Sequence, residues 1–452
     1  MKKIQKIVMA FLLGTMTWGF TACSNDNDVA GGSEVTVLPE VGQATTTISS
    51  SDKEMQKVAK NYVQNVIYPT YQALAANART LYGATQTLYK AAEAGTMTQS
   101  HIDAACEAFK DTRREWERSE AFLFGSAERN ELDPHIDSWP LDRDELVKAL
   151  NNPTLIAGFK SDNPAKFVSD NNTNFQSVLG FHGMEFVLFR GGAHRTVEAL
   201  KANDTDEGVT SVKGIDELAF LQAVAADVRN ITALLEFTWM GSATSQESKT
   251  ILSGEGNYVF STLRYNGLAA NGAMCYGDFF LSPSSTTGYS SWQGTMNQIF
   301  VGGCSGICAE VADQKLGQSY RVATGHAGTT EDGGKESIDY IESPYSHRSF
   351  IDYQDNIYSI KNSLYGTRDI NATAPADYSM MSLLKKMNYS GYDNLVNALN
   401  NAIQVLETAK NSGKSFVEEP GAQRVKDCID AVSKLDTELN NAGAWINKQE
   451  VL

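Results

Sequence analysis

The sequence lacks the excess of basic residues that a nucleic-acid-binding protein usually needs. Its 452 residues include 38 lysines and arginines against 54 aspartates and glutamates, and the formal net charge is −16. Nucleic-acid binding usually requires a basic face, so this balance speaks against a nucleic-acid partner. An acidic protein attracts cations instead.

Cysteines and histidines are too few, and wrongly spaced, for the common zinc motifs. No C-x-x-C pair occurs among the six cysteines, which excludes a zinc knuckle. Cys304 and Cys308 have helical i, i+4 spacing, which puts their Cβ atoms about 5–6 Å apart, too far for a relaxed disulfide. Neither H-E-x-x-H nor H-x-x-E-H occurs among the six histidines. A zinc-protease helix therefore cannot form locally, and a metal site here must be rich in oxygen ligands.

A long apolar run is evident only at the N-terminus. Residues 1–22 combine a basic start with the stretch IVMAFLLGTMTWGF, which is short for a membrane span. The stretch ends in FTAC, which resembles the lipobox of a bacterial lipoprotein. It predicts cleavage before Cys23 and lipidation of that cysteine; an ordinary secretory signal is the alternative. We expect no later segment to span a bilayer, so the mature domain is tethered through Cys23.

The remainder of the chain has the pattern of a helical protein. Residues 23–50 are rich in Ser, Thr, Gly and Asn, which predicts a flexible linker after the lipidated cysteine. From residue 51 apolar residues recur at i+3 and i+4, whereas sustained alternation of apolar and polar residues is scarce. These patterns predict an all-α fold of two helical-bundle-like domains, residues 51–245 and residues 246–452.

Glu120 is the first candidate site residue. The helix expected around residues 102–123 has an apolar face that includes positions 109, 116 and 120. Glu120 therefore lies where core is expected, while Glu115 and Glu117 are expected on the outer side. Such a carboxylate either caps a neighbouring helix, pairs with an arginine such as Arg113, or serves as a ligand.

His182 and Glu185 form the second candidate, within the apolar run GFHGMEFVLF. They are three residues apart and so share one face of a helix. Burial of such a pair is costly unless it is paired, hydrogen-bonded or metal-bound. Gly180 and Gly183 disfavour a helix, and they make sense where another backbone or a ligand approaches closely. The pair is either a satisfied polar contact or part of a metal site, and its donors suit iron or zinc, with manganese as a further candidate.

The third candidate is a polar stripe in IESPYSHRSFIDYQDNIYSIKNSLYG. Ser343–Pro344 has the pattern of an N-cap followed by proline, which predicts a helix from that point. About a third of the circumference of this helix is polar, which is either its wet face or a binding surface. The stripe contains Ser346, Ser349, Asp352 and Asn356, and Glu342 joins it if the preceding turn is tight.

Three of these stretches resemble motif blocks of the imelysin-like family. WERSEAFLFG, followed by DPHIDSWP at residues 133–140, resembles its first block. GFHGME matches its G-x-H-x-x-E signature, and ESPYSHRSFID with the later DNI and YG resembles its late block. The blocks occur in the family's order, and the matches extend over most of residues 55–450.

The resemblance implies two helical domains with a site in the cleft between them, centred on His182 and Glu185. Glu120 and the polar residues of the late block are then neighbours of that site. Family members sit in the periplasm or on the outer membrane; one is an insulin-cleaving membrane protease, and others are iron-regulated and associated with iron uptake. We therefore expect a lipoprotein anchored to the outer membrane, with the membrane face left open.

Three functions remain in contention at this point. In the first, a non-enzymatic protein binds a divalent or ferric metal ion, iron rather than zinc, or an iron-bearing ligand, with Glu120, His182 and Glu185 as ligands. In the second, a metallopeptidase uses His182 and Glu185 to polarise water. In the third, the motif residues only join the two domains of a surface lipoprotein. No local motif combines a base with ligands, so we favour binding.

Overall fold

Helices form nearly all of the regular structure. The computed structural model describes residues 49–171, 176–206, 209, 211–254, 275–283, 289–330 and 333–449. Within these ranges the strands form two short antiparallel pairs: β1 (Phe189–Arg190) with β2 (Ala193–His194), and β3 (Asn203–Asp204) with β4 (Val212–Lys213). The predicted all-α class is confirmed. The signal segment, Cys23 and nearly all of the predicted linker lie outside the described residues.

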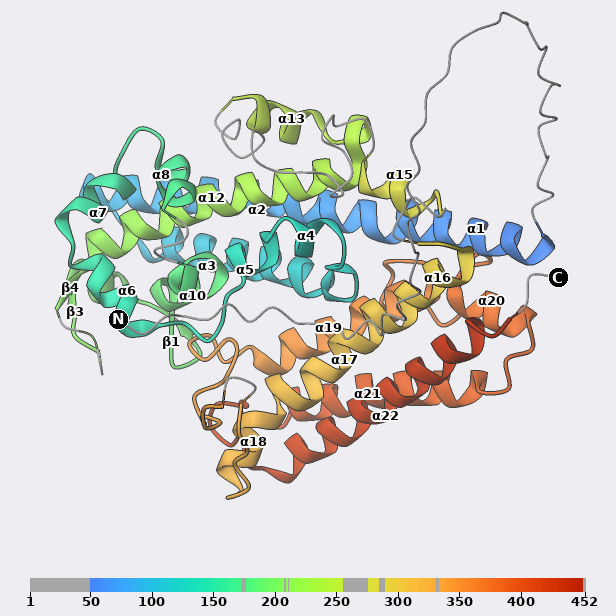
Figure 1. The fold of residues 1–452 in the computed structure, drawn as a ribbon. Coiled ribbons are helices and arrows are strands. Elements are labelled where there is room, and N and C mark those ends of the chain that lie inside the picture. The colour runs from blue at the N-terminus through green and yellow to red at the C-terminus, as the bar shows by residue number, and fades with distance from the viewer. Residues whose placement is uncertain are drawn as a thin grey trace, which may run out of the picture. The chain divides into compact units, whose positions relative to one another are not determined.

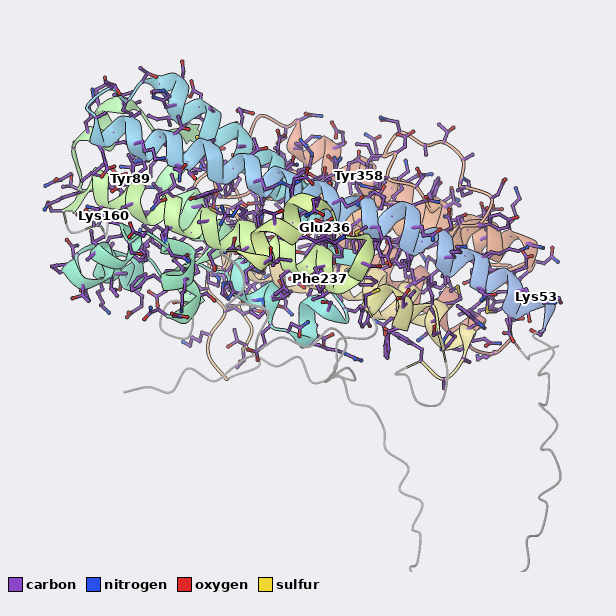
Figure 2. The ribbon with its side chains drawn as sticks, turned by 90° about the horizontal axis from the view of Figure 1, so that it is seen from above. Lys53, Tyr89, Lys160, Glu236, Phe237 and Tyr358 are labelled. Atoms are coloured by element: carbon purple, nitrogen blue, oxygen red, sulfur yellow. The ribbon has the colours of Figure 1, made fainter. Side chains whose placement is uncertain are left out.

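A long helical rod begins the described chain. It consists of α1 (Ser50–Tyr62), the π-helical segment η1 (Val63–Ile67) and α2 (Tyr68–Glu93). Pro69 lies in the first turn of α2 and has no N–H to donate. One α-helical hydrogen bond is therefore lost there, and the helix widens into a π turn directly before it. Figure 2 shows this rod running from Lys53 at one end to Tyr89 at the other.

The next helices pack around α12 (Gly214–Met240), which lies beside α2 (Figure 1). The segment Gly214–Ala243 has the length and mean hydropathy, 1.3, of a membrane span, so our expectation of no such segment after the signal was wrong. Its most apolar 18-residue window is entirely buried in the protein, because a helix that is apolar all round forms core when other helices cover it. The elements in this part are α3 (Gln99–Glu117), η2 (Glu120–Phe122), α4 (Ser126–Arg129), α5 (Leu132–Ile136), α6 (Arg143–Leu150), α7 (Pro153–Phe159), α8 (Pro164–Asp170), η3 (Gln176–Val178), α10 (Gly180–Leu188), α11 (Val197–Lys201), η4 (Gly241–Ala243) and α13 (Gln246–Ser253).

Two long amphipathic helices, α21 (Tyr392–Lys410) and α22 (Gln423–Ile446), pack against each other in the last part of the chain (Figure 1). α21 also contacts α19 (Ser349–Tyr365), and π-helical segments contact α22. The remaining elements are α15 (Tyr276–Phe280), α16 (Trp292–Asn297), η5 (Gln298–Ser305), α17 (Gly306–Ala309), η6 (Glu310–Lys315), α18 (Gly317–Ala323) and α20 (Met380–Lys386).

Contacts between distant parts of the sequence position the candidate site. α19 packs against α3 and η2, which brings the late motif block next to the first one. Residues Ile48–Leu452 form one compact unit by their contacts, and the division near residue 245 with a cleft between two domains stays a prediction.

Candidate metal centre

α10 is a short helix whose nine residues are all buried, and it carries both His182 and Glu185. Gly180 begins it with a φ of +67°, and a Cβ atom there would lie 1.9 Å from the carbonyl oxygen of Ile136. A Cβ atom on Gly183 would lie 2.1 Å from the carbonyl oxygen of Val178. Both glycines are therefore explained by the close approach of another backbone segment, which seats α10 deep in the protein.

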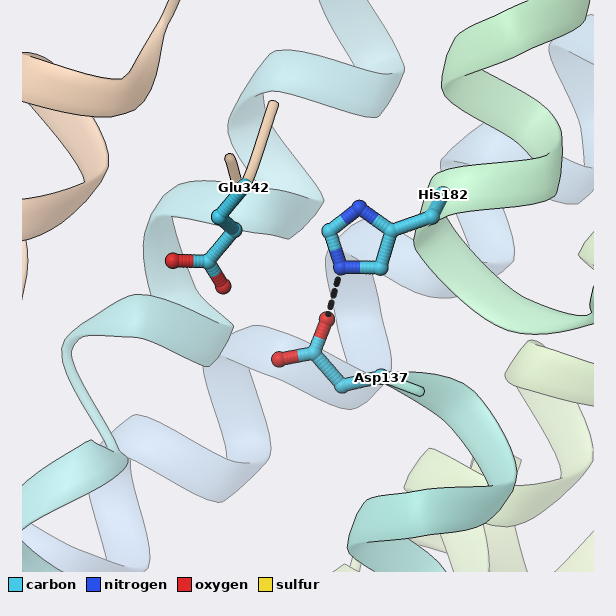
Figure 3. Close-up of side chains that lie close together, drawn as sticks. All are labelled: Asp137, His182 and Glu342. Atoms are coloured by element: carbon cyan, nitrogen blue, oxygen red, sulfur yellow. Dashed lines mark hydrogen bonds and ion pairs between the residues drawn. The ribbon is translucent and has the colours of Figure 1, made fainter. Parts of the chain in front are cut away.

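The His182 imidazole lies between two carboxylates (Figure 3 shows the first). Its Nε2 lies 3.0 Å from Oδ1 of Asp137, just after α5, and its Nδ1 lies 3.9 Å from Oε2 of Glu185. Burial lowers the pKa of His182, but the hydrogen bond to Asp137 and the nearby Glu185 carboxylate outweigh it and raise this pKa to about 9. The imidazole is therefore protonated at neutral pH in the metal-free protein.

The Glu185 carboxylate joins α10 to the loop before α19. Its Oε1 accepts hydrogen bonds from the backbone N–H of Tyr345 at 3.1 Å and of Ser346 at 2.7 Å, and from Ser346 Oγ at 2.6 Å. Its Oε2 is buried and accepts no hydrogen bond among the described residues. One oxygen thus holds the loop, and the other faces the imidazole.

Arg113 on α3 is the central cation of the cluster. Its guanidinium is buried and contacts four carboxylates, which belong to Glu117 (2.5 Å), Asp137, Glu342 (2.5 Å) and Asp352 (4.0 Å). Burial raises the pKa of Asp137, but Arg113 and His182 hold it well below its usual range. Trp116 Nε1 donates a further hydrogen bond to Asp137 Oδ2 at 2.6 Å.

Negative charge exceeds positive charge in this cluster. Among the described residues, three buried cationic groups, Arg113, Lys315 and protonated His182, face six buried carboxylates: Glu117, Glu120, Asp137, Glu185, Glu342 and Asp352. Burial raises the pKa of Asp352 to about 6 and lifts those of Glu117 and Glu120 well above the usual range. Burial thus makes the excess negative charge costly, and a metal cation that enters would offset part of it.

The polar stripe of the late block is buried, so it is not a wet face of its helix. Each member holds another part of the cluster through a hydrogen bond of 2.5–2.7 Å. Ser346 binds Glu185, Ser349 Oγ donates to the carbonyl oxygen of Glu342, Asp352 accepts from Ser343 Oγ, and Asn356 Nδ2 donates to Glu117 Oε2.

The helix that we expected from Ser343–Pro344 begins later than predicted. α19 begins at Ser349, and residues before it form a turn in which Ser343 and His347 have φ values of +58° and +56°. The Ser343 hydroxyl bonds to Asp352, and Glu185 takes the next backbone N–H groups. These tertiary contacts replace the expected N-cap.

The positions expected for the glutamates around the end of α3 need correction. Glu115 and Glu117 are 6% and 0% exposed rather than on an outer side: Glu115 forms an ion pair with Arg368, and Glu117 is covered by α19 and accepts a hydrogen bond from its Asn356. Glu120 lies beyond α3, in η2, and is buried as expected. Its ion pair is with Lys315, at 3.9 Å, rather than with Arg113.

Three side chains come close enough to share one metal ion. Asp137, His182 and Glu342 each offer a ligand atom, and these atoms lie within 4.8 Å of one another (Figure 3). His182 was expected as a ligand and Glu342 as a ligand-binding or interdomain residue. Ligand roles for Glu120 and Glu185 stay predictions.

The sequence did not identify Asp137 and Lys315 as site residues, and it suggested Arg113 only as a possible partner of Glu120. Asp137 lies inside DPHIDSWP, a stretch that indicated only the family resemblance and not a site. Arg113 lies four residues after Phe109 and three before Trp116, on the apolar face of α3, and this position was its signal. Lys315 carries no comparable pattern.

Comparison with known proteins agrees with the motif blocks. The family model described as imelysin, whose name classes it as a peptidase, matches residues 67–439. An iron-regulated protein A from Synechococcus elongatus is 29% identical over 154 residues, which cover 34% of this chain and 35% of that protein. The chain thus spans about a third of that relative's length.

Two solved structures share the fold. One, assigned as an iron-regulated protein A precursor from Parabacteroides distasonis, gives a TM-score of 0.64 at 22% identity, over 88% of this chain and 96% of that one. The other, an imelysin-like protein from Psychrobacter arcticum, gives a TM-score of 0.50 at 14% identity, over 89% of this chain and 96% of that one. Because the family model matches most of the length of this chain, the chain belongs to the imelysin family.

Proposed function

We propose that this protein binds a metal ion, iron in preference to zinc, through Asp137, His182 and Glu342, as a non-enzymatic lipoprotein of iron uptake. The observation that carries the proposal is the three ligand atoms within 4.8 Å of one another in a buried, acidic cluster. Two carboxylates with one imidazole suit iron, which accepts both donor types. The name iron-regulated protein A, borne by a partial relative, agrees with iron.

The residues present fit such an ion. His182 Nε2 and Asp137 Oδ1 are 3.0 Å apart. Two neighbouring ligands at right angles around a metal, each about 2.1 Å from it, are separated by about 3.0 Å. Glu342 Oε2 is buried and accepts no hydrogen bond within the part of the chain that the structure describes; its charge faces the Lys315 ammonium at 3.1 Å, and a metal ion would take the place of that cation. Arg113 contacts both carboxylates, and a metal would share them with its guanidinium.

Glu185 orients the imidazole in this proposal. With Nε2 directed at the metal, Nδ1 keeps its proton and faces Glu185 Oε2 at 3.9 Å. Metal-bound histidines usually donate their other N–H to a carboxylate or carbonyl, which fixes the ring. The loop contacts of Oε1 hold that carboxylate in place.

A metallopeptidase would use the same residues, and the family name raises that alternative. Such an enzyme needs an open metal position, a base within reach and a groove for an extended peptide. Asp137, His182 and Glu342 are only 7%, 2% and 0% exposed, which favours a small ion over a peptide. The purified protein is therefore assayed for peptide cleavage. If it cleaves peptides and Glu185→Gln abolishes the cleavage without unfolding the protein, the metallopeptidase function is correct and the non-enzymatic binding function is rejected.

The last part of the proposal is that a lipid on Cys23 attaches the protein to the outer membrane. The lipobox-like stretch FTAC and the basic start of the chain support this attachment. Labelled fatty acid should be incorporated into the wild type and not into Cys23→Ser. An unlabelled wild-type chain in the membrane fraction would contradict the anchor.

Elemental mass spectrometry tests the metal proposal. The purified protein is incubated with Fe²⁺ under anaerobic conditions, or with Zn²⁺, and dialysed. We expect about one ion per wild-type chain and its loss in His182→Ala. His194→Ala is the matched control, because His194 lies in a surface group with Asp103 and Glu107. Full occupancy in His182→Ala, or none in the wild type, would overturn the proposal.

A further inference from the structure

The Lys315 ammonium sits in a cage of oxygen atoms next to the proposed metal ligands. The side chain is 1% exposed, and its Nζ lies at 3.1 and 3.3 Å from the two oxygens of Glu342. Oxygens of Asn356, Glu310 and Glu120 follow at 3.4, 3.7 and 3.9 Å. We call these five oxygens the lysine cage. They belong to four side chains, and three of the four are acidic.

The lysine cage is larger than an ammonium group requires. An ammonium donates three hydrogen bonds, and its contacts with carboxylates are usually about 2.7–2.9 Å long. All five distances here exceed that range. Charge therefore holds Lys315 more than directed hydrogen bonds do. Burial lowers the pKa of Lys315, but Glu120, Glu342 and their acidic neighbours raise it well above its usual value, so the group is a cation.

Glu342 belongs to both the lysine cage and the proposed metal centre. Its two oxygens are the nearest to the ammonium, and one of them is the ligand atom that lies close to those of Asp137 and His182. A metal ion on Glu342 would repel a cation a few ångströms away, and this repulsion is strong in a buried site. The two cations therefore compete for one carboxylate.

The position of Lys315 allows its head group to leave. It is the last residue of η6, and π-helical segments are frequent at functional sites. Its four-carbon stem is flexible, so the ammonium can move without a shift of the backbone. Glu310, 3.7 Å from Nζ, has a side chain that is 30% exposed, so this side of the lysine cage lies nearest to solvent.

We propose that Lys315 is a built-in competitor for the metal: its ammonium occupies the lysine cage in the metal-free protein and withdraws when an ion binds Glu342. The inference rests on the proposed function. It assigns Lys315 to regulation of affinity, since the lysine stabilises the empty acidic cluster and weakens metal binding. A metal that enters takes over the charge compensation that Lys315 provided.

Substitution of Lys315 tests this competition. Binding of Mn²⁺ and Zn²⁺ is measured by equilibrium dialysis on wild type, Lys315→Met, Lys315→Gln and Lys315→Arg. We expect at least tenfold tighter binding in the two neutral variants and little change in Lys315→Arg. The matched control is Lys361→Met, because Lys361 is also buried but, among the described residues, its Nζ donates to the carbonyl oxygen of Ile370, at 2.7 Å, and to no carboxylate.

Thermal unfolding supplies the second readout. Both neutral variants should unfold at lower temperature than the wild type in chelator. Saturating Mn²⁺ should raise their unfolding temperatures by more than it raises those of the wild type and of Lys361→Met. If the wild type binds metal, and the neutral variants bind no tighter and their unfolding temperatures rise no more, the competition is refuted while the proposed function stands. If the wild type binds neither Mn²⁺ nor Zn²⁺ but a neutral variant does, the competition holds, and the Fe²⁺ measurement described above decides the proposed function. Absence of binding of both ions in all variants refutes the competition.

Discussion

Removal of the charge on Asp137 is the perturbation that tests the cluster most directly. Asp137 holds Arg113, His182 and the Trp116 N–H, and its side chain is 4% exposed. Asp137→Asn keeps the shape and removes the charge. Breaking one partner out of a buried ion pair costs about 3–5 kcal/mol, so we expect a loss of unfolding free energy in that range at pH 6.5 in chelator.

The pH dependence gives this prediction its sign. The pKa of His182 is about 9 in the folded protein, against an ordinary value of 6.5. Protonation of His182 therefore favours the folded state by about 3 kcal/mol below pH 6.5, and this contribution is lost as pH rises through 9. In Asp137→Asn a main cause of the raised pKa is gone while burial still lowers it, so the His182 part of the curve should flatten.

Urea unfolding of the metal-free protein at pH 6.5, 8 and 9.5, with NMR of carbon-13-labelled histidine, measures both quantities. Asp227→Asn is the matched control, because Asp227 forms another buried pair with His135, at 2.5 Å. It should also destabilise the protein but leave the His182 pKa and the bound metal unchanged. A loss below 1 kcal/mol in Asp137→Asn, or a His182 pKa still near 9, would refute the account of the cluster.

Three further predictions concern the same region. Gly180→Ala should lower the free energy of unfolding by at least about 3 kcal/mol in urea, because the new Cβ meets backbone at 1.9 Å. Gly191→Ala is its control: it is also at positive φ but in open space, and should cost about 1–2 kcal/mol. Equal losses in the two variants would contradict the close approach. Ser346→Ala removes a 2.6 Å hydrogen bond to the Glu185 carboxylate and should cost about 1.5–3 kcal/mol in the same assay; no loss would mean that the loop is held otherwise. Metal affinity should rise between pH 6.5 and 9, because binding must displace the His182 proton; calorimetry in buffers of different ionisation enthalpy should detect a released proton, and pH-independent affinity would exclude His182 as a ligand.

The cluster combines ligands and internal cations in one buried volume. Arg113 and Lys315 neutralise part of the acidic charge and thereby make a metal-free state stable enough to persist. The same cations limit how tightly a metal binds, because each shares a carboxylate with the proposed ion.

The sequence by itself determined the helical class, because apolar spacing at i+3 and i+4 is a local property of each segment. It also put His182 and Glu185 on one helix face, since three-residue spacing suffices for that. Two glycines in the same run indicated a close approach, and the structure shows that the approaching group is backbone at Ile136 and Val178.

Only the tertiary structure decided how the charges compensate one another. Arg113 meets Glu342 across 229 residues of sequence, and Asn356 meets Glu117 across 239. Complementarity between such distant residues has no local pattern, and an arginine or lysine that belongs to a buried network has the same sequence appearance as one in solvent. The side of α3 that carries Glu117 became interior because α19 packs across it, and that contact exists only in the folded chain.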